Sequence, residues 1–79
     1  MYLTYILYSE KIQKYYTGQT ANLANRLQEH NQGETPSIRM GIPWVIIWSH
    51  PSQTRQEAMK LEKKIKARGA QRFIQDLKR

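Results

Sequence analysis

The sequence predicts an α+β domain in which a small three-stranded antiparallel sheet is packed by helices, with elements in the order β-β-α-β-α-α. Two runs rich in aromatic and β-branched residues open the chain and are joined by a short polar stretch, which is typical of a β-hairpin. A third apolar run lies at 44–48, and two segments of helical periodicity each end near a glycine. The 79 residues predict a single domain, 1–79.

The hairpin consists of a strand over residues 2–9, a polar stretch to residue 14 and a second strand that begins at residues 15–17. This pairing brings Tyr5 and Tyr16 onto neighbouring strands. Gly18 is expected to end the second strand, because glycine adopts backbone angles that other residues resist.

Thr20 or Asn22 is expected to cap a helix that runs to about residue 32, where Gly33 ends it. Residues 31–43 hold two glycines and two prolines with little periodicity and are predicted to form a loop. The apolar run 44–48 scarcely alternates, so we expect a buried, central strand there.

Thr54 and Glu57 fit a capping box that opens a helix to about residue 67, and Gly69 closes this helix. A last short helix, about 70–78, is expected to bury Phe73, Ile74 and Leu77.

The formal charge of +7 and a pI near 10.0 favour a polyanionic partner, most commonly nucleic acid. Residues 54–79 carry nine of the thirteen Lys and Arg and three of the six acids. Basic side chains there can grip phosphates without reading bases; a solubilising helix surface is the alternative. The candidates are Arg55, Lys60, Lys63, Lys64, Lys66, Arg68 and Arg72.

The chain has no cysteine, which excludes thiol catalysis, disulfides and thiolate zinc sites and fits a reducing cytoplasm. It also lacks an apolar run of the roughly 18 residues that a membrane-spanning helix needs. We therefore expect a cytoplasmic protein that does not span a membrane.

Arg26 and His30 lie four residues apart on the first predicted helix and so share one face. A guanidinium can bind two phosphate oxygens, and an imidazole can donate a hydrogen bond or exchange a proton near neutral pH. The alternative is a solvated helix face, with His30 favoured by the helix dipole near the C-terminal end. Arg26 could also lower the pKa of a nearby tyrosine and make it a general base.

Glu62 falls inside the edge of the apolar stripe formed by Ala58, Leu61 and Ile65. A partly shielded carboxylate should be paired, protonated or bound to a cation. A salt bridge to Arg26 or to a lysine and a metal site are both consistent with this position.

Together these positions resemble the GIY-YIG endonuclease family, specifically its small single-domain members. Leu3-Thr4-Tyr5 stands where the family has Gly-Ile-Tyr, and Tyr16-Thr17-Gly18 where it has Tyr-Ile-Gly. The helix with Arg26 and His30 is similar to the second family motif, and the segment 57–66 to the helix with the metal-binding glutamate.

The resemblance implies that Tyr5 and Tyr16 orient or deprotonate the attacking water. It implies that Arg26 stabilises the phosphate in the transition state, and that His30 assists proton transfer or holds the phosphate. Glu62 would bind one divalent cation, Mg²⁺ or Mn²⁺, because hard cations prefer carboxylate and phosphate oxygens.

The leading hypothesis is therefore a metal-dependent endonuclease that hydrolyses DNA with structure selectivity, in DNA repair or recombination. One alternative is a catalytically weak module of the same fold that binds nucleic acid or docks a partner. Another, based on charge alone, is a basic protein that binds RNA or an anionic membrane surface. A protein partner or a homodimer is also left open.

Overall fold

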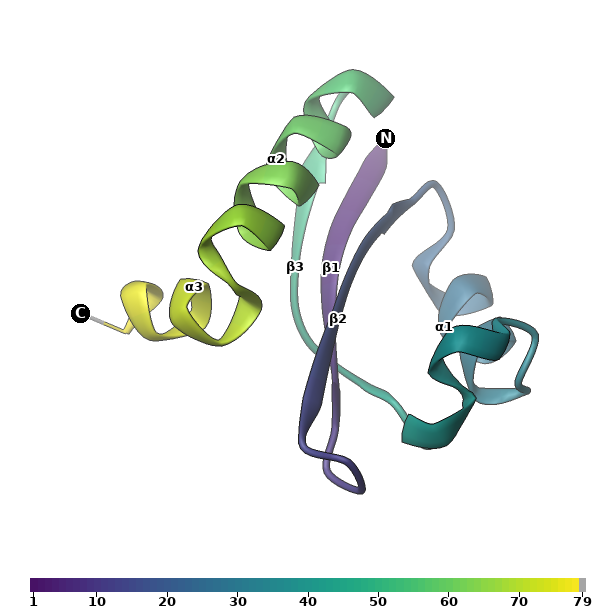
Figure 1. The fold of residues 1–79 in the computed structure, drawn as a ribbon. Helices are drawn as coiled ribbons and strands as arrows, with labels where there is room; N and C mark the ends of the chain where they lie inside the picture. The colour runs from purple at the N-terminus through teal and green to yellow at the C-terminus, as the bar shows by residue number, and fades with distance from the viewer. Residues whose placement is uncertain (79) are drawn as a thin grey trace.

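The computed structural model describes residues 1–78; Arg79, the last residue of the predicted domain, lies outside the described range. The elements follow the predicted order, with one addition. They are β1 (Tyr2–Ser9), β2 (Lys14–Thr20), α1 (Leu23–Asn31), the 3-10 helix η1 (Pro36–Gly41), β3 (Val45–Ser52), α2 (Arg55–Arg68) and α3 (Ala70–Leu77). Figure 1 shows the sheet on edge, with α1 and η1 on one face and α2 and α3 on the other.

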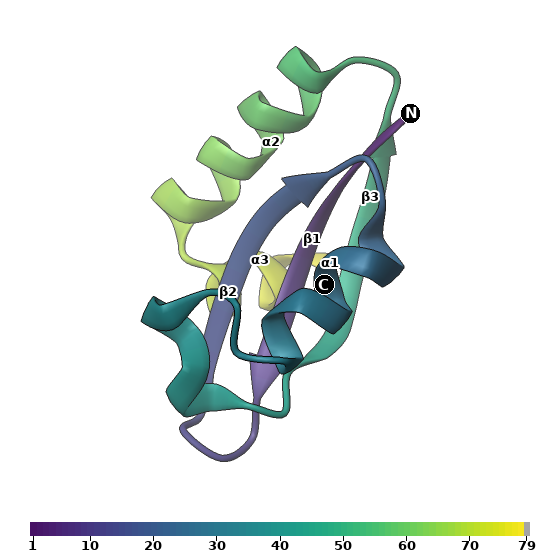
Figure 2. The same cartoon turned by 90° about the vertical axis from the view of Figure 1, so that its right-hand side faces the viewer.

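The sheet is antiparallel in the order β2-β1-β3, so β1 is the central strand. Its residues alternate between the two faces, and both faces are covered by helices. Tyr5 and Leu7 join the apolar cluster with Trp44 on the α1 side. On the opposite face the Thr4 hydroxyl donates a hydrogen bond of 3.0 Å to the carbonyl of Ala58 in α2. The sheet is therefore the middle layer of three, as the view in Figure 2 also shows.

The predicted position of the third strand is wrong, because β3 lies at the edge of the sheet instead of its centre. Val45, Ile46 and Ile47 are 51%, 38% and 41% exposed. An unbroken apolar run does not reveal which strand is central, since only long-range pairing decides it. The strand also runs on to Ser52 through Pro51, which an edge strand tolerates.

The first helix begins and ends where local signals predicted. The Asn22 side chain accepts a hydrogen bond from the Asn25 amide at 3.1 Å and so caps α1, and Gly33 takes a left-handed φ of 81° after its last turn. Within the predicted loop, residues 36–41 form η1. Asn31 holds this segment in place through hydrogen bonds to both the backbone N–H and the carbonyl of Trp44.

The second and third helices also match their predicted bounds to within a residue or two. The Thr54 hydroxyl accepts a hydrogen bond from the Glu57 amide, and Gly69 takes a φ of 93° between α2 and α3. Phe73 packs edge-on against Trp48, but Phe73 and Ile74 are only half-buried. Leu77 is 52% exposed, so its predicted burial is wrong. An eight-residue helix at the margin of the sheet finds too little surface to cover its whole apolar face.

No helix among the described residues combines the length and the apolar character that crossing a membrane requires.

Candidate active site

Tyr5 lies directly over Gly18, its partner in the β1–β2 register. A Cβ atom at position 18 would come within 2.6 Å of the Tyr5 hydroxyl oxygen, so only glycine leaves room for the phenol. The expected reason for this glycine is therefore wrong: β2 continues past it to Thr20 and its φ is not in the left-handed region. Because Gly18 has no side chain, the Tyr5 phenol can approach the backbone of β2 closely and lie across this outer strand.

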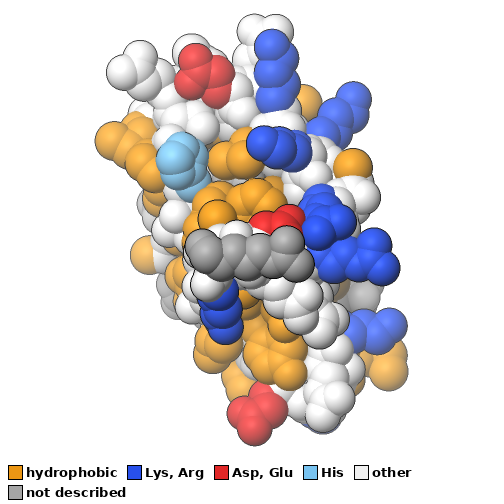
Figure 3. Space-filling view, turned by 90° about the vertical axis from the view of Figure 1, so that its left-hand side faces the viewer, with side chains coloured by type: hydrophobic (Ala, Val, Ile, Leu, Met, Phe, Trp, Pro, Cys, Tyr) orange, Lys and Arg blue, Asp and Glu red, His pale blue; other side chains and the backbone are white. Residues whose placement is uncertain are grey.

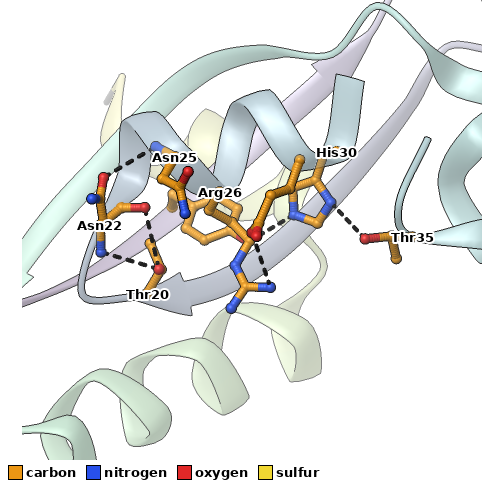
Figure 4. Close-up of polar contacts among 8 residues, drawn as sticks. Thr20, Asn22, Asn25, Arg26, His30 and Thr35 are labelled. Atoms are coloured by element: carbon orange, nitrogen blue, oxygen red, sulfur yellow. Dashed lines mark hydrogen bonds and ion pairs between the residues drawn. The ribbon is translucent and has the colours of Figure 1, made fainter. Parts of the chain in front are cut away.

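His30 is buried, with 2% of its surface exposed, and its ring joins two parts of the chain. Nε2 shares a hydrogen bond of 3.1 Å with the Tyr5 hydroxyl, and Nδ1 shares one of 3.1 Å with the Thr35 hydroxyl. Figure 4 shows this ring between α1 and Thr35. The solvated-face interpretation is thus wrong for His30, whose contact is with the tyrosine.

The imidazole is held neutral. Burial lowers the pKa of His30, and the nearby Arg26 guanidinium lowers it further, against a smaller opposing effect of Glu29. In the neutral ring one nitrogen donates and the other accepts, which suits two hydroxyl partners. His30 therefore fixes the orientation of the Tyr5 phenol.

Tyr5 keeps its proton at neutral pH. Burial raises its pKa above the usual range, the neighbouring Tyr16 raises it further, and Arg26 only partly opposes this. The expectation that Arg26 would turn a tyrosine into a base by lowering its pKa is wrong for Tyr5. This phenol can donate or relay a hydrogen bond but is a poor general base.

Tyr16 is the more accessible of the two tyrosines. Its half-buried ring lies 6.4 Å from the ring of Tyr5 and 5.1 Å from that of His30, between centroids. It also lines a surface groove between β2 and the junction of α2 with α3. Of the site tyrosines, Tyr16 is the one placed to meet a water molecule or a substrate.

Arg26 projects from α1, as Figure 4 shows, with 45% of its side chain exposed. Its nearest acid is Glu29, with 3.8 Å between Nη1 and Oε1, which is a loose pair. Arg26 lies one helical turn before His30 on α1, and its charge lowers the pKa of both Tyr5 and His30. The guanidinium is accessible to an anion that approaches Tyr5.

Glu62 lies in α2, on the opposite face of the sheet, yet its charge also raises the pKa of Tyr5. Its side chain is 22% exposed and Oε2 is 2.7 Å from the Lys66 ammonium nitrogen. The inference that this carboxylate is partly shielded is confirmed, and its partner is a lysine. Gln19, the residue after Gly18, lines the same hollow as Glu62; it pairs with Thr4 in the β1–β2 register, so it shares the α2 face of the sheet with Glu62.

The single carboxylate of Glu62 fits a metal ion that keeps most of its coordinated water molecules. Within residues 1–78 no three Asp, Glu, His or Cys side chains form a group that could enclose a metal. Mg²⁺ is commonly held by one or two carboxylates together with water and substrate phosphates. Glu62 alone could therefore hold such an ion if water and a substrate phosphate supplied the other ligands.

The structure separates the seven predicted phosphate-binding residues into three sets. Lys66, Arg68 and Arg72 line the Tyr16 groove, which has a volume of about 680 Å³ and also includes Lys14. Lys60 and Lys63 flank the hollow of Glu62. Arg55 and Lys64 line neither. Figure 3 shows the Lys and Arg side chains gathered along the flank of the α2–α3 face where β2 lies.

Sequence reasoning missed Thr35 and Lys14. Thr35 lies in an irregular segment after α1, where no periodicity announces its contact with His30. Lys14 could have been found, because it opens β2 immediately before Tyr15 and Tyr16. Its inclusion extends the basic groove to the turn end of the hairpin.

In a comparison with known protein families, the model of the GIY-YIG catalytic domain matches residues 1–73 of the 79. No curated protein and no solved structure matches the chain significantly.

Proposed function

The chain belongs to the GIY-YIG family of DNA nucleases, and on that basis we propose that it is an endonuclease that hydrolyses DNA with a divalent cation bound at Glu62. One observation carries the proposal. The Tyr5 phenol, held by His30, lies over Gly18 of the edge strand β2, with Arg26 in α1 on one face of the sheet and Glu62 in α2 on the other. A cationic fork and an anionic metal ligand thus flank a preorganised tyrosine.

In the proposed reaction the phosphate lies at the outer edge of β2, beside Gly18. Arg26 binds two of its oxygens and meets the negative charge that develops on phosphorus as water attacks. Tyr16 orients the water by a hydrogen bond. The water oxygen forms the new bond to phosphorus while the bond to the 3′ oxygen breaks. The proton that the attacking water releases balances the proton that the 3′ oxygen takes up.

Tyr5 and His30 contribute positioning. The neutral imidazole is fixed by Thr35, and it fixes the protonated phenol in turn, so the phenol can donate a hydrogen bond without reorganisation. A divalent cation at Glu62 would supply positive charge to the leaving oxygen. These assignments give each of the five residues of the constellation a separate task.

We further propose that the enzyme selects DNA by structure, at branches or flaps, and acts in repair or recombination. The charged residues that line the groove next to Tyr16 are all basic: Lys14, Lys66, Arg68 and Arg72. Such side chains position a phosphate backbone without reading bases. An accessible groove at a sheet edge accommodates a strand that diverges from a duplex.

Cleavage of labelled duplex, single-stranded, flap and four-way-junction DNA, with Mg²⁺, Mn²⁺ or EDTA, tests the proposal. We expect metal-dependent cutting by the wild type. Glu62→Gln should still bind DNA, but its cleavage rate should fall by about 100-fold or more. Glu57→Gln is the matched control, because it removes the same charge from an exposed position in the same helix; it should cut like the wild type.

Two results would contradict the proposal. Equal cleavage rates of Glu62→Gln and wild type would show that Glu62 is not the metal ligand. If no substrate is cut but both proteins bind DNA with the same salt dependence, the domain is a nucleic-acid-binding module without turnover.

A further inference from the structure

The ammonium group of Lys66 forms an ion pair with the Glu62 carboxylate, where the proposed function places a metal ion. Its Nζ lies 2.7 Å from Oε2 of Glu62, one helical turn away. We propose that Lys66 is an exchangeable residue: it pairs with Glu62 in the free protein and transfers to a DNA phosphate on binding, which frees Glu62 for the metal. This inference rests on the proposed function.

The two cations compete for the same oxygens. A divalent ion such as Mg²⁺ approaches a carboxylate oxygen to about 2.0–2.1 Å, and an ammonium group at 2.7 Å already uses a lone pair of that oxygen. Two positive charges at such separations also repel each other. The Lys66 contact therefore weakens the binding of a metal ion at Glu62.

Lys66 has a second place to go, because its side chain also lines the Tyr16 groove. The side chain is 58% exposed, so a change of rotamer meets little obstruction. Its neighbour Arg68 is instead held by Asp76 through two hydrogen bonds of 2.9 and 3.0 Å. Lys66 thus lines the groove and at the same time pairs with Glu62.

A DNA phosphate in the groove offers Lys66 an alternative anion. Once the ammonium group moves there, Glu62 regains its full negative charge and its free lone pairs. DNA should therefore strengthen metal binding, and metal should strengthen DNA binding by the same factor, because such coupling is reciprocal. The free protein would hold its metal weakly until substrate arrives.

Titration with Mn²⁺ alone, with free Mn²⁺ measured by electron paramagnetic resonance, tests the exchange without any turnover. Lys66→Met removes the competing ammonium, and Lys64→Met is the matched control, which removes the same charge from the same helix at a position that lines neither hollow. Lys66→Met should bind Mn²⁺ about fivefold more tightly than Lys64→Met. Equal affinities of the two variants would overturn the inference.

Two further arms complete the test. A flap oligonucleotide with phosphorothioate linkages at the branch should tighten Mn²⁺ binding by the wild type and have less effect on Lys66→Met; an equal effect on both would also refute the exchange. Glu62→Gln should lose Mn²⁺ binding. If Glu62→Gln loses Mn²⁺ binding while Lys66→Met and Lys64→Met bind Mn²⁺ equally, only the role of Lys66 is wrong. If Glu62→Gln retains Mn²⁺ binding, the proposed metal site is wrong as well.

Discussion

The buried imidazole of His30 should make the fold sensitive to mild acid. Its pKa is lowered by burial and by Arg26 in the folded protein, whereas in the unfolded chain it returns to about 6.5. The unfolded state therefore binds more protons below pH 6.5, and the free energy of unfolding must fall as the pH decreases. The contribution of His30 is complete above pH 6.5 and is lost progressively between that value and the lower folded pKa.

The size of the effect follows from one proton. The free energy of unfolding changes by at most about 1.4 kcal/mol per pH unit for each proton taken up. A loss of that size is a substantial part of the roughly 5–15 kcal/mol that stabilises a small domain. The hydroxyls of Tyr5 and Thr35 can still accept hydrogen bonds from the imidazolium, so the loss comes from burying its charge near Arg26.

Urea unfolding at pH 7.5, 6.5, 5.5 and 5.0 measures this dependence, compared between wild type and His30→Gln. The glutamine amide does not titrate, while carboxylate contributions are common to both proteins. The chain has one other histidine, His50, which is exposed on β3, so His50→Gln should retain the full dependence. If wild type and His30→Gln show the same slope between pH 6.5 and 5.5, the argument from burial is refuted.

Two substitutions separate catalysis from stability. Arg26→Lys should slow cleavage by about 10²–10³-fold, because an ammonium cannot bind two phosphate oxygens as a fork. Its unfolding free energy should change by less than about 0.5 kcal/mol, since the side chain is exposed and only loosely paired with Glu29; a large loss of stability would reassign Arg26 to the scaffold. Tyr5→Phe keeps the buried ring but leaves Nε2 of His30 without its partner, so it should cost about 1–3 kcal/mol in urea unfolding as well as slowing cleavage. Wild-type stability of Tyr5→Phe would show that this hydrogen bond is not formed.

The elements could be predicted because their ends are marked locally. Asn22 and Thr54 provide side-chain caps, and Gly33 and Gly69 take left-handed angles after the helices. The shielding of Glu62 was also predictable, since helical periodicity alone places it at the edge of an apolar stripe.

Other features depend on long-range packing, and sequence patterns could not supply them. The apolar run of β3 reads as a central strand, but the pairing of β1 with both neighbours leaves β3 outside. In the sequence, His30 lies at the edge of the apolar stripe of its helix. It is buried only because Tyr5 of β1 and Thr35 pack against it in the folded protein. For the same reason the pKa of Tyr5 moves opposite to the expected direction: a nearby cation is visible in the sequence, but the extent of burial is not.

The close contact between Tyr5 and Gly18 has a consequence for how such chains diverge. Any side chain at position 18 would clash with the Tyr5 phenol, so a substitution there is unfavourable as long as Tyr5 is present. The two positions therefore cannot change independently. The tyrosine must be lost first, and the glycine becomes replaceable only afterwards. We therefore expect a larger residue at position 18 to mark relatives that have already abandoned this site, even where the rest of the fold persists.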